Sequence, residues 1–219
     1  MLFAFSKGNP TLSFQLPKLY PITDRRLSGL SHAEQVAHFS AGGATLVQLR
    51  EKHLDAREFY SQAKIALDAA RECGVRLIIN DRVDIALALG ADGVHLGQDD
   101  LPPEAARRIL GEKAIIGFST HNLEQAREAA ALPVDYIAVG PIFETSSKEN
   151  PDPKLGTFAL KTVRAIVGEK PLVAIGGISA ETAQATLDAG ADSVAVISLL
   201  LAEPEKIAER TRELFNNLK

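Results

Sequence analysis

The sequence has one cysteine, Cys73, and no tryptophan among its 219 residues. A single thiol can form neither an internal disulfide framework nor a zinc site built from several thiolates. Low cysteine usage fits a reducing compartment, so we expect a cytoplasmic protein.

Long apolar runs and a strong charge of one sign are also absent. No stretch approaches the ~18 apolar residues of a membrane-spanning helix, and a net charge of -4 leaves no electrostatic footprint for nucleic acid. Hydrophobic residues make up 46% of the chain, which is enough for a full core. We therefore expect no nucleic-acid or membrane partner. Small-molecule substrates are expected instead, and a homo-oligomer is compatible with the sequence.

Residues 1–18 are the one irregular segment. Their apolar run is too short for a signal peptide, so they are predicted to be an N-terminal extension that packs on the protein or frays. Residues 19–219 contain no composition shift or low-complexity tract. They are predicted to form one catalytic domain.

Within residues 19–219, short apolar runs alternate with amphipathic segments. The runs predict eight strands, at 19–23, 45–50, 77–79, 93–96, 114–118, 136–139, 172–175 and 193–197. Helices are predicted after them, at 33–40, 55–72, 83–89, 102–110, 123–131, 158–167, 180–189 and 203–215. This order predicts an α/β protein, a single-domain parallel (β/α)8 TIM barrel. A doubly wound open sheet is the alternative, but no glycine-rich dinucleotide fingerprint follows the first strand.

Two neighbouring predicted strands end in acidic side chains. Asp81 follows the strand at 77–79, and Asp100 follows the strand at 93–96. The carboxyl ends of barrel strands are where active sites lie, and two facing carboxylates repel unless a cation lies between them. Mg²⁺, a hard ion that prefers oxygen ligands, suits that position. The alternative is that both aspartates cap the helices that follow them.

Cationic side chains follow the predicted strand at 45–50. Side chains alternate along a strand, so Gln48, Arg50 and Lys52 are expected on one side. Arginine suits bidentate phosphate contacts and lysine acts as a point charge, so the pair predicts a polyanion beside the metal. The alternative is a surface salt bridge with Glu51.

A second set of anion-seeking groups follows the later strands. Thr145, Ser147 and Lys148 lie in a long loop at 144–156, which is predicted to act as a lid. Gly177 and Ser198 follow the seventh and eighth strands, where barrels of this kind often bind phosphate. The alternatives are a solvated loop and two ordinary turns.

Histidines give no metal cluster, because no two lie four residues apart. His95 is expected to pack inside the barrel mouth, and His121 either reaches the site or caps a helix. No nucleophile stands beside a base. One metal-assisted anion site and one metal-free site suit a group transfer in which pyrophosphate leaves and a phosphorylated substrate attacks.

Six motifs closely resemble the thiamine phosphate synthase family. They are Gln-Leu-Arg-Glu-Lys (48–52), Ile-Asn-Asp-Arg-Val-Asp (79–84), Gly-Val-His-Leu-Gly-Gln-Asp-Asp (93–100), Gly-Phe-Ser-Thr-His (117–121), Val-Gly-Pro-Ile-Phe (139–143) and Ala-Ile-Gly-Gly-Ile (174–178). The motifs occur in order, and the resemblance as a whole runs from about Leu19 to the C-terminus. The resemblance implies a transferase of thiamine biosynthesis that joins hydroxymethylpyrimidine diphosphate to thiazole (carboxy)phosphate and releases pyrophosphate.

The resemblance also implies roles for individual residues. Gln48, Arg50, Lys52 and Asn80 would hold the pyrimidine diphosphate. Mg²⁺, bound by Asp81 and Asp100, would be the cofactor. Ser119 would contact the pyrimidine or its diphosphate, and Lys148 the leaving pyrophosphate, which gives Lys148, Ser119 and Arg50 catalytic roles. Thr145, Ser147, Gly177, Ile197 and Ser198 would bind the thiazole phosphate.

The chain departs from the family pattern in one loop. The family's Thr-x-Thr-Lys stands here as Thr-Ser-Ser-Lys, residues 145–148, which keeps the hydroxyl. The related thiazole tautomerases carry a histidine where Pro141 stands, so Pro141 and the two intact aspartates favour the synthase. A tautomerase and a regulatory barrel that only binds thiamine intermediates are the alternatives.

Overall fold

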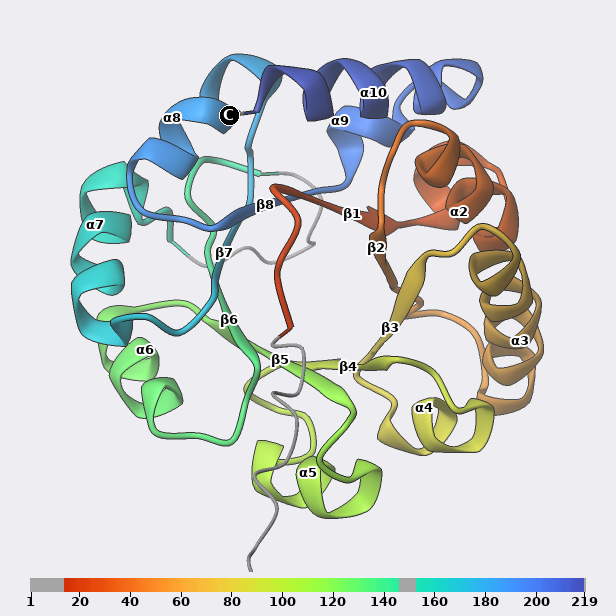
Figure 1. The fold of residues 1–219 in the computed structure, drawn as a ribbon, viewed down its shortest axis with the longest axis horizontal. Coiled ribbons are helices and arrows are strands. Elements are labelled where there is room, and N and C mark those ends of the chain that lie inside the picture. Colours follow the sequence, from red (N-terminus) through yellow and green to blue (C-terminus); the bar gives the residue numbers. More distant parts are fainter. Residues whose placement is uncertain (1–13, 146–152, 219) are drawn as a thin grey trace, which may run out of the picture.

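The computed structural model describes residues 14–145 and 153–218, and in it eight parallel strands pair in sequence order. β8 pairs with β1, so the sheet closes into a barrel, which Figure 1 shows as the inner ring. The strands are β1 Leu19–Thr23, β2 Leu46–Leu49, β3 Arg76–Asn80, β4 Gly93–Leu96, β5 Ile115–Thr120, β6 Tyr136–Val139, β7 Leu172–Ile175 and β8 Ser193–Val196.

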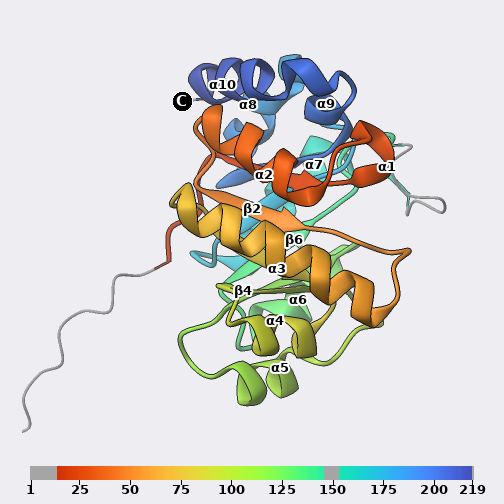
Figure 2. The same cartoon turned by 90° about the vertical axis from the view of Figure 1, so that its right-hand side faces the viewer.

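Helices connect the strands and form the outer ring (Figures 1 and 2). They are α1 Arg25–Ser28, α2 His32–Ala41, α3 Ala56–Glu72, α4 Val83–Leu89, α5 Pro103–Leu110, α6 Leu123–Ala130, α7 Gly156–Val167, α8 Ala180–Asp188, α9 Ser198–Leu201, a 3₁₀ turn η1 Pro204–Lys206, and α10 Ile207–Asn217. The C-terminal helix α10 packs on α2 and so closes the outer ring.

The apolar core has two layers, because side chains alternate along each strand. The larger layer lies between strands and helices and includes Val47 and Leu77. The smaller layer fills the barrel and includes Ile22, Leu46 and Ile78. Strands buried on both faces need continuous apolar runs, which is the pattern the sequence shows.

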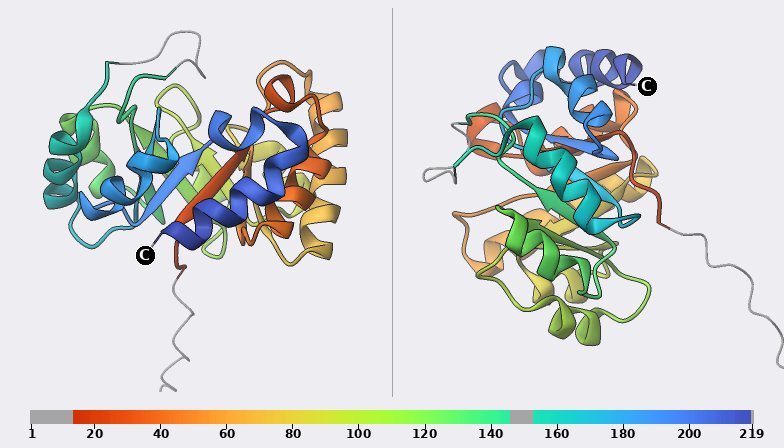
Figure 3. Two further views of the ribbon diagram at one scale, coloured as in Figure 1. Left: turned by 90° about the horizontal axis from the view of Figure 1, so that it is seen from above. Right: turned by 90° about the vertical axis from the view of Figure 1, so that its left-hand side faces the viewer.

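The segment before β1 packs on the barrel interior. Phe14 and Leu16 pack against the inner layer, and the Phe14 ring centroid lies 6.0 Å from that of Tyr136. Figure 3 shows this segment at the end of the barrel opposite the loop after β6. Residues 1–13 lie outside the described part, so the division into an extension (1–18) and a barrel (19–219) stays a prediction. Across residues 14–145 and 153–218, no helix is long and apolar enough to cross a membrane.

The predicted (β/α)8 barrel is confirmed, and the open-sheet alternative is wrong. Three local predictions need correction. β5 runs on to Thr120, so Ser119 lies within the strand. α1 was not expected, because its Arg-Arg-Leu-Ser sequence has no periodicity; the Asp24 side chain caps it. The helix expected at 203–215 is interrupted near its start, where η1 begins at Pro204.

Candidate active site

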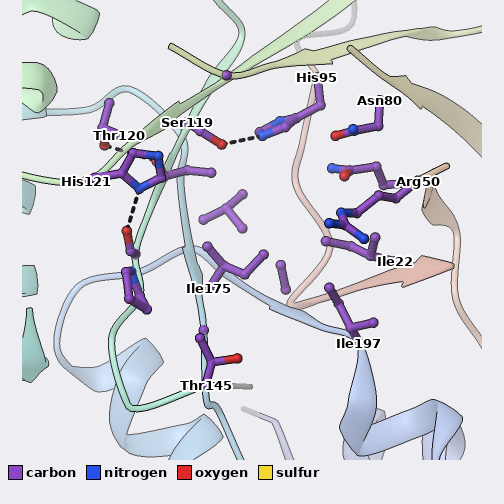
Figure 4. Close-up of a pocket in the computed structure, with 18 of the residues that line it drawn as sticks. Ile22, Arg50, Asn80, His95, Ser119, Thr120, His121, Thr145, Ile175 and Ile197 are labelled. Carbon is purple, nitrogen blue, oxygen red and sulfur yellow. Dashed lines mark hydrogen bonds between the residues drawn. The ribbon is translucent and has the colours of Figure 1, made fainter. Parts of the chain in front are cut away.

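A cavity of about 490 Å³ opens at the carboxyl ends of the strands. Most of the residues predicted to bind a ligand line it, from β2 and β3 around to the loops after β7 and β8 (Figure 4). They are Gln48, Arg50, Lys52, Asn80, Asp81, Asp100, Ser119, Thr145, Gly177, Ile197 and Ser198. Ser147 and Lys148 lie outside the described residues.

Neither predicted metal ligand caps a helix. The N-cap of α4 is Arg82 and that of α5 is Pro102, and neither receives a side-chain cap. The Asp100 carboxylate instead accepts a hydrogen bond from the Gly97 N–H at 2.7 Å. The capping alternative for Asp81 and Asp100 is therefore wrong.

Asp81 holds a left-handed backbone conformation, with φ of 63°. Aspartate tolerates this region better than most residues. Burial raises the pKa of its carboxyl group, Lys52 opposes that shift, and the neighbouring Asp100 reinforces it. The two carboxyl groups thus meet, and the ion pair of Asp81 with Lys52 compensates only part of the cost.

Arg50 and Lys52 both face the cavity, as the alternation along β2 predicted. The Arg50 guanidinium lies 3.4 Å from the Asp24 carboxylate. Among the residues that the structure describes, the Glu51 carboxylate forms an ion pair with Arg25 and a hydrogen bond with His32, and no ion pair with Arg50 or Lys52. The surface salt bridge considered from the sequence is therefore wrong.

Asn80 is 6% exposed, and its Nδ2 has no hydrogen-bond partner among the described residues. A buried donor without a partner costs about 1–3 kcal/mol, so such groups call for an explanation. Asn80 and Arg50 line the same side of the cavity (Figure 4). This arrangement suits a ligand rich in oxygen atoms.

Two histidines contribute to the wall. His95 is buried, as predicted, and its Nε2 lies 2.8 Å from the Ser119 hydroxyl. His121 also lines the cavity, and its Nδ1 lies 2.8 Å from the Gly140 carbonyl oxygen. Figure 4 draws both hydrogen bonds.

The opposite wall is made by the loops after β6, β7 and β8, with Pro141 and Thr145 on one side and Gly177 and Ser198 on the other. Gly177 has φ of 64°, and a Cβ there would lie 2.2 Å from the Glu144 carbonyl oxygen. No side chain fits, because the loop after β7 packs against the loop after β6, so Gly177 presents only backbone to the cavity that it lines. This suits a phosphate held by N–H groups.

Sequence reasoning missed the floor of the cavity. Tyr20, Ile22, Ala138, Val173 and Ala195 line it from four strands, β1, β6, β7 and β8. Their signal was the inward alternation along each strand, which the apolar runs concealed because both faces are buried. Gln98 was also missed; its side chain donates to the Ser119 carbonyl oxygen at 2.6 Å.

The fold and the site define a (β/α)8 barrel protein with one mouth suited to two anionic groups. The family model described as "Thiamine monophosphate synthase" matches residues 19–200. The chain belongs to this family.

Individual relatives agree. The "Thiamine-phosphate synthase" of Koribacter versatilis is 47% identical over 208 residues, covering 93% of this chain and 98% of its own. That of Clostridium novyi is 47% identical over 185 residues, covering 84% and 90%. The solved "Thiamine phosphate pyrophosphorylase" of Pyrococcus furiosus superposes with a TM-score of 0.81 at 39% identity, covering 91% of this chain and 94% of that one.

Proposed function

We propose that this chain is a transferase that makes thiamine phosphate, as the names of its relatives indicate. Its substrates are the aminopyrimidine diphosphate and the thiazole phosphate, carboxylated or not. Pyrophosphate is the second product, and a carboxylated thiazole would also lose its carboxylate as CO₂. The proposal depends most on the Asn80 amide, a buried donor without a partner beside two cations. Self-association and a cytoplasmic location remain predictions.

The diphosphate fits the wall formed by β2 and β3. Arg50 can bind phosphate oxygens in a bidentate manner, Lys52 supplies a point charge, and Asn80 gives the unpaired donor. Gln48 and Ser119 lie deeper, where a pyrimidine ring would rest on the apolar floor. Substrate binding would release Lys52 from Asp81 when a metal takes over that carboxylate.

The acidic pair fits Mg²⁺. Among the described residues, no group of three or more histidine, cysteine, aspartate or glutamate side chains could hold a metal. Mg²⁺ does not need such a cage, because it is usually bound by one or two carboxylates together with waters and substrate phosphates. Asp81 and Asp100 supply those two carboxylates, and their mutual repulsion favours a cation between them. When bound, the metal would neutralise negative charge on the diphosphate.

The thiazole phosphate fits the opposite wall. Gly177 and Ser198 would bring backbone N–H groups to it, and Thr145 would add a hydroxyl. Ser147 and Lys148, which lie outside the described residues, would complete the site in this proposal. The two anions would then sit on opposite sides of one cavity, which holds the reacting atoms between them.

The reaction follows from this placement. The C–O bond between the pyrimidine methylene and the diphosphate breaks, and its electron pair leaves with pyrophosphate. The aminopyrimidine ring holds the resulting cation, and the thiazole nitrogen lone pair forms the new C–N bond. Arg50 and Lys52 stabilise the charge that grows on the leaving group, so the chain needs no nucleophile.

One incubation tests the proposal. The protein is mixed with both phosphorylated precursors and Mg²⁺, and products are identified by mass spectrometry. Thiamine phosphate with pyrophosphate supports the proposal. An isomerised thiazole phosphate would indicate a tautomerase, and binding without turnover would indicate a regulatory barrel; either result would refute it.

A further inference from the structure

A continuous chain of hydrogen bonds crosses the barrel beneath the cavity. The Gln48 Nε2 lies 3.4 Å from the Tyr20 hydroxyl, which lies 2.9 Å from the Tyr136 hydroxyl. Tyr136 lies 2.9 Å from the His95 Nδ1. The His95 Nε2 lies 2.8 Å from the Ser119 hydroxyl, the contact drawn in Figure 4. Five side chains from five strands are thus linked, and both ends line the cavity.

The chain of hydrogen bonds has a direction, because at each link one partner donates and the other accepts. The Gln48 Nε2 has no lone pair to offer, so it donates to Tyr20. Each phenol has one hydrogen and keeps it, because burial raises the pKa of both Tyr20 and Tyr136. The buried Tyr20 hydrogen needs an acceptor, and among the described residues its hydrogen-bond partner for that role is the Tyr136 oxygen, so Tyr20 donates to Tyr136. Tyr136 in turn donates to the Nδ1 of His95. The neutral His95 ring then carries its hydrogen on Nε2 and donates to Ser119. The hydrogen of Ser119 is left to point into the cavity.

We propose that the three inner members of this chain, Tyr20, Tyr136 and His95, are positioning residues. They hold the two ends in opposite hydrogen-bonding states, so that Gln48 offers its carbonyl oxygen as an acceptor and Ser119 offers its hydroxyl as a donor. One end cannot change state unless all four hydrogen bonds reverse and the Gln48 amide turns over. Cooperative chains of this kind resist such a change.

The consequence is selectivity between two pyrimidine rings as ligands, and this inference rests on the proposed function. An aminopyrimidine edge has an amino donor beside a ring-nitrogen acceptor, which complements Gln48 and Ser119. The 4-oxo ring that replaces the amino group has the reverse pattern, with a carbonyl acceptor beside an N–H donor. Buried polar groups left unpaired reject such an analogue strongly. The chain of hydrogen bonds thus makes the cavity bind the amino ring more tightly than the oxo ring.

The test is Tyr136→Phe, which removes one hydroxyl from the middle of the chain. Tyr136 lies outside the residues that line the cavity, so the change leaves the cavity wall intact. The affinities for the aminopyrimidine diphosphate and its 4-oxo analogue are measured by calorimetry with Mg²⁺ and without the thiazole substrate. We expect the preference for the amino ring to fall about tenfold, as expected for one lost hydrogen bond. A preference within about twofold of wild type would overturn the proposal.

Two further variants separate positioning from stability. Thr186→Val removes another fully buried hydroxyl, on α8, and should lower stability without changing the preference. Ser119→Ala removes one end of the chain, and adding Tyr136→Phe to it should have no further effect on the preference. Equal effects of Tyr136→Phe in both backgrounds would refute action through Ser119.

The binding data also separate this proposal from the proposed function. A protein that prefers the amino ring through Tyr136 but makes no thiamine phosphate would refute the function alone. A protein that makes thiamine phosphate with an unchanged preference in Tyr136→Phe would refute the positioning chain alone. Failure of the wild-type protein to prefer the amino ring would also refute the proposal that the hydrogen-bond chain selects the ring.

Discussion

The Glu51 carboxylate accepts a hydrogen bond from the Nε2 of the fully buried His32, across 3.4 Å. On the other side of the ring, Nδ1 lies 2.7 Å from the Thr23 hydroxyl, which accepts from the Arg50 N–H at 3.2 Å. Glu51 also accepts from the Lys52 N–H. A neutral His32 therefore anchors the segment that presents Arg50 and Lys52 to the cavity.

The buried, neutral His32 predicts that the protein loses stability in acid. Burial lowers the pKa of His32, and the opposing effects of Glu51 and Asp24 do not restore it; Arg25 lowers it further. Below a pH of about 6.5, the unfolded chain binds a proton that the folded chain refuses. Stability should therefore fall as the pH falls through that value, by at most about 1.4 kcal/mol per pH unit. Urea denaturation at pH 7.5 and 5.5 measures this loss.

His32→Gln is the matched variant, because its amide can still donate to Glu51 but does not titrate. It should lose less stability than wild type between the two pH values. Burial raises the pKa of Glu51, but hydrogen bonds from His53, His32 and Lys52 bring it below its usual value. Glu51 therefore takes up a proton, and affects stability, only at lower pH. Equal losses in the two proteins would contradict a titrating His32.

Asn80→Leu should weaken binding without weakening the fold. The buried Nδ2 has no partner among the described residues, so removing it relieves a cost of about 1–3 kcal/mol. The unfolding free energy should stay equal or rise, while the affinity for the pyrimidine diphosphate falls about tenfold. Denaturation and calorimetry on the same sample measure both. A large loss of stability with unchanged affinity would mean that Asn80 is structural.

Asp81→Asn removes a charge and keeps a residue that tolerates positive φ. Turnover in the presence of Mg²⁺ should fall about 100-fold, while the protein stays folded. Asp188→Asn makes the same change at an exposed residue of α8 outside the cavity and should have little effect. Steady-state rates across a magnesium titration compare the two. Full wild-type activity in EDTA would refute the metal assignment.

Lys148 and Ser147, the loop residues predicted from the sequence, should affect different kinetic constants. Charge builds on pyrophosphate as the C–O bond breaks, so a cation that meets it acts mainly on the transition state. Lys148→Ala should lower kcat on the order of 100-fold with little change in KM for the thiazole phosphate. Ser147→Ala should instead raise that KM. Near wild-type values for both would mean that the loop is only a solvated connection.

The strands and the acid and cation sets could be predicted because each depends on local sequence. Continuous apolar runs mark buried parallel strands, and residues that follow a strand must lie at its carboxyl end. The side on which Arg50 and Lys52 lie, just after β2, followed from alternation alone. The turn that aims Asp81 at the cavity could not be predicted, because nothing in the sequence marks its positive φ.

Contacts across the barrel interior were also beyond the sequence. Tyr20 and Tyr136 are 116 residues apart and hydrogen bond at 2.9 Å only because the sheet closes with a particular stagger. The same holds for Glu51: the sequence suggests an ion pair with Arg50 or Lys52, but its carboxylate hydrogen bonds with His32. Such pairs depend on register and closure, which apolar runs leave open.

The most direct test of the site is a crystal structure with Mg²⁺ and an unreactive pyrimidine diphosphate analogue, in which CH₂ replaces the oxygen that would leave. We expect the metal between Asp81 and Asp100, and the diphosphate against Arg50, Lys52 and Asn80. A diphosphate bound instead beside Gly177 and Ser198, or a metal held away from both aspartates, would contradict it.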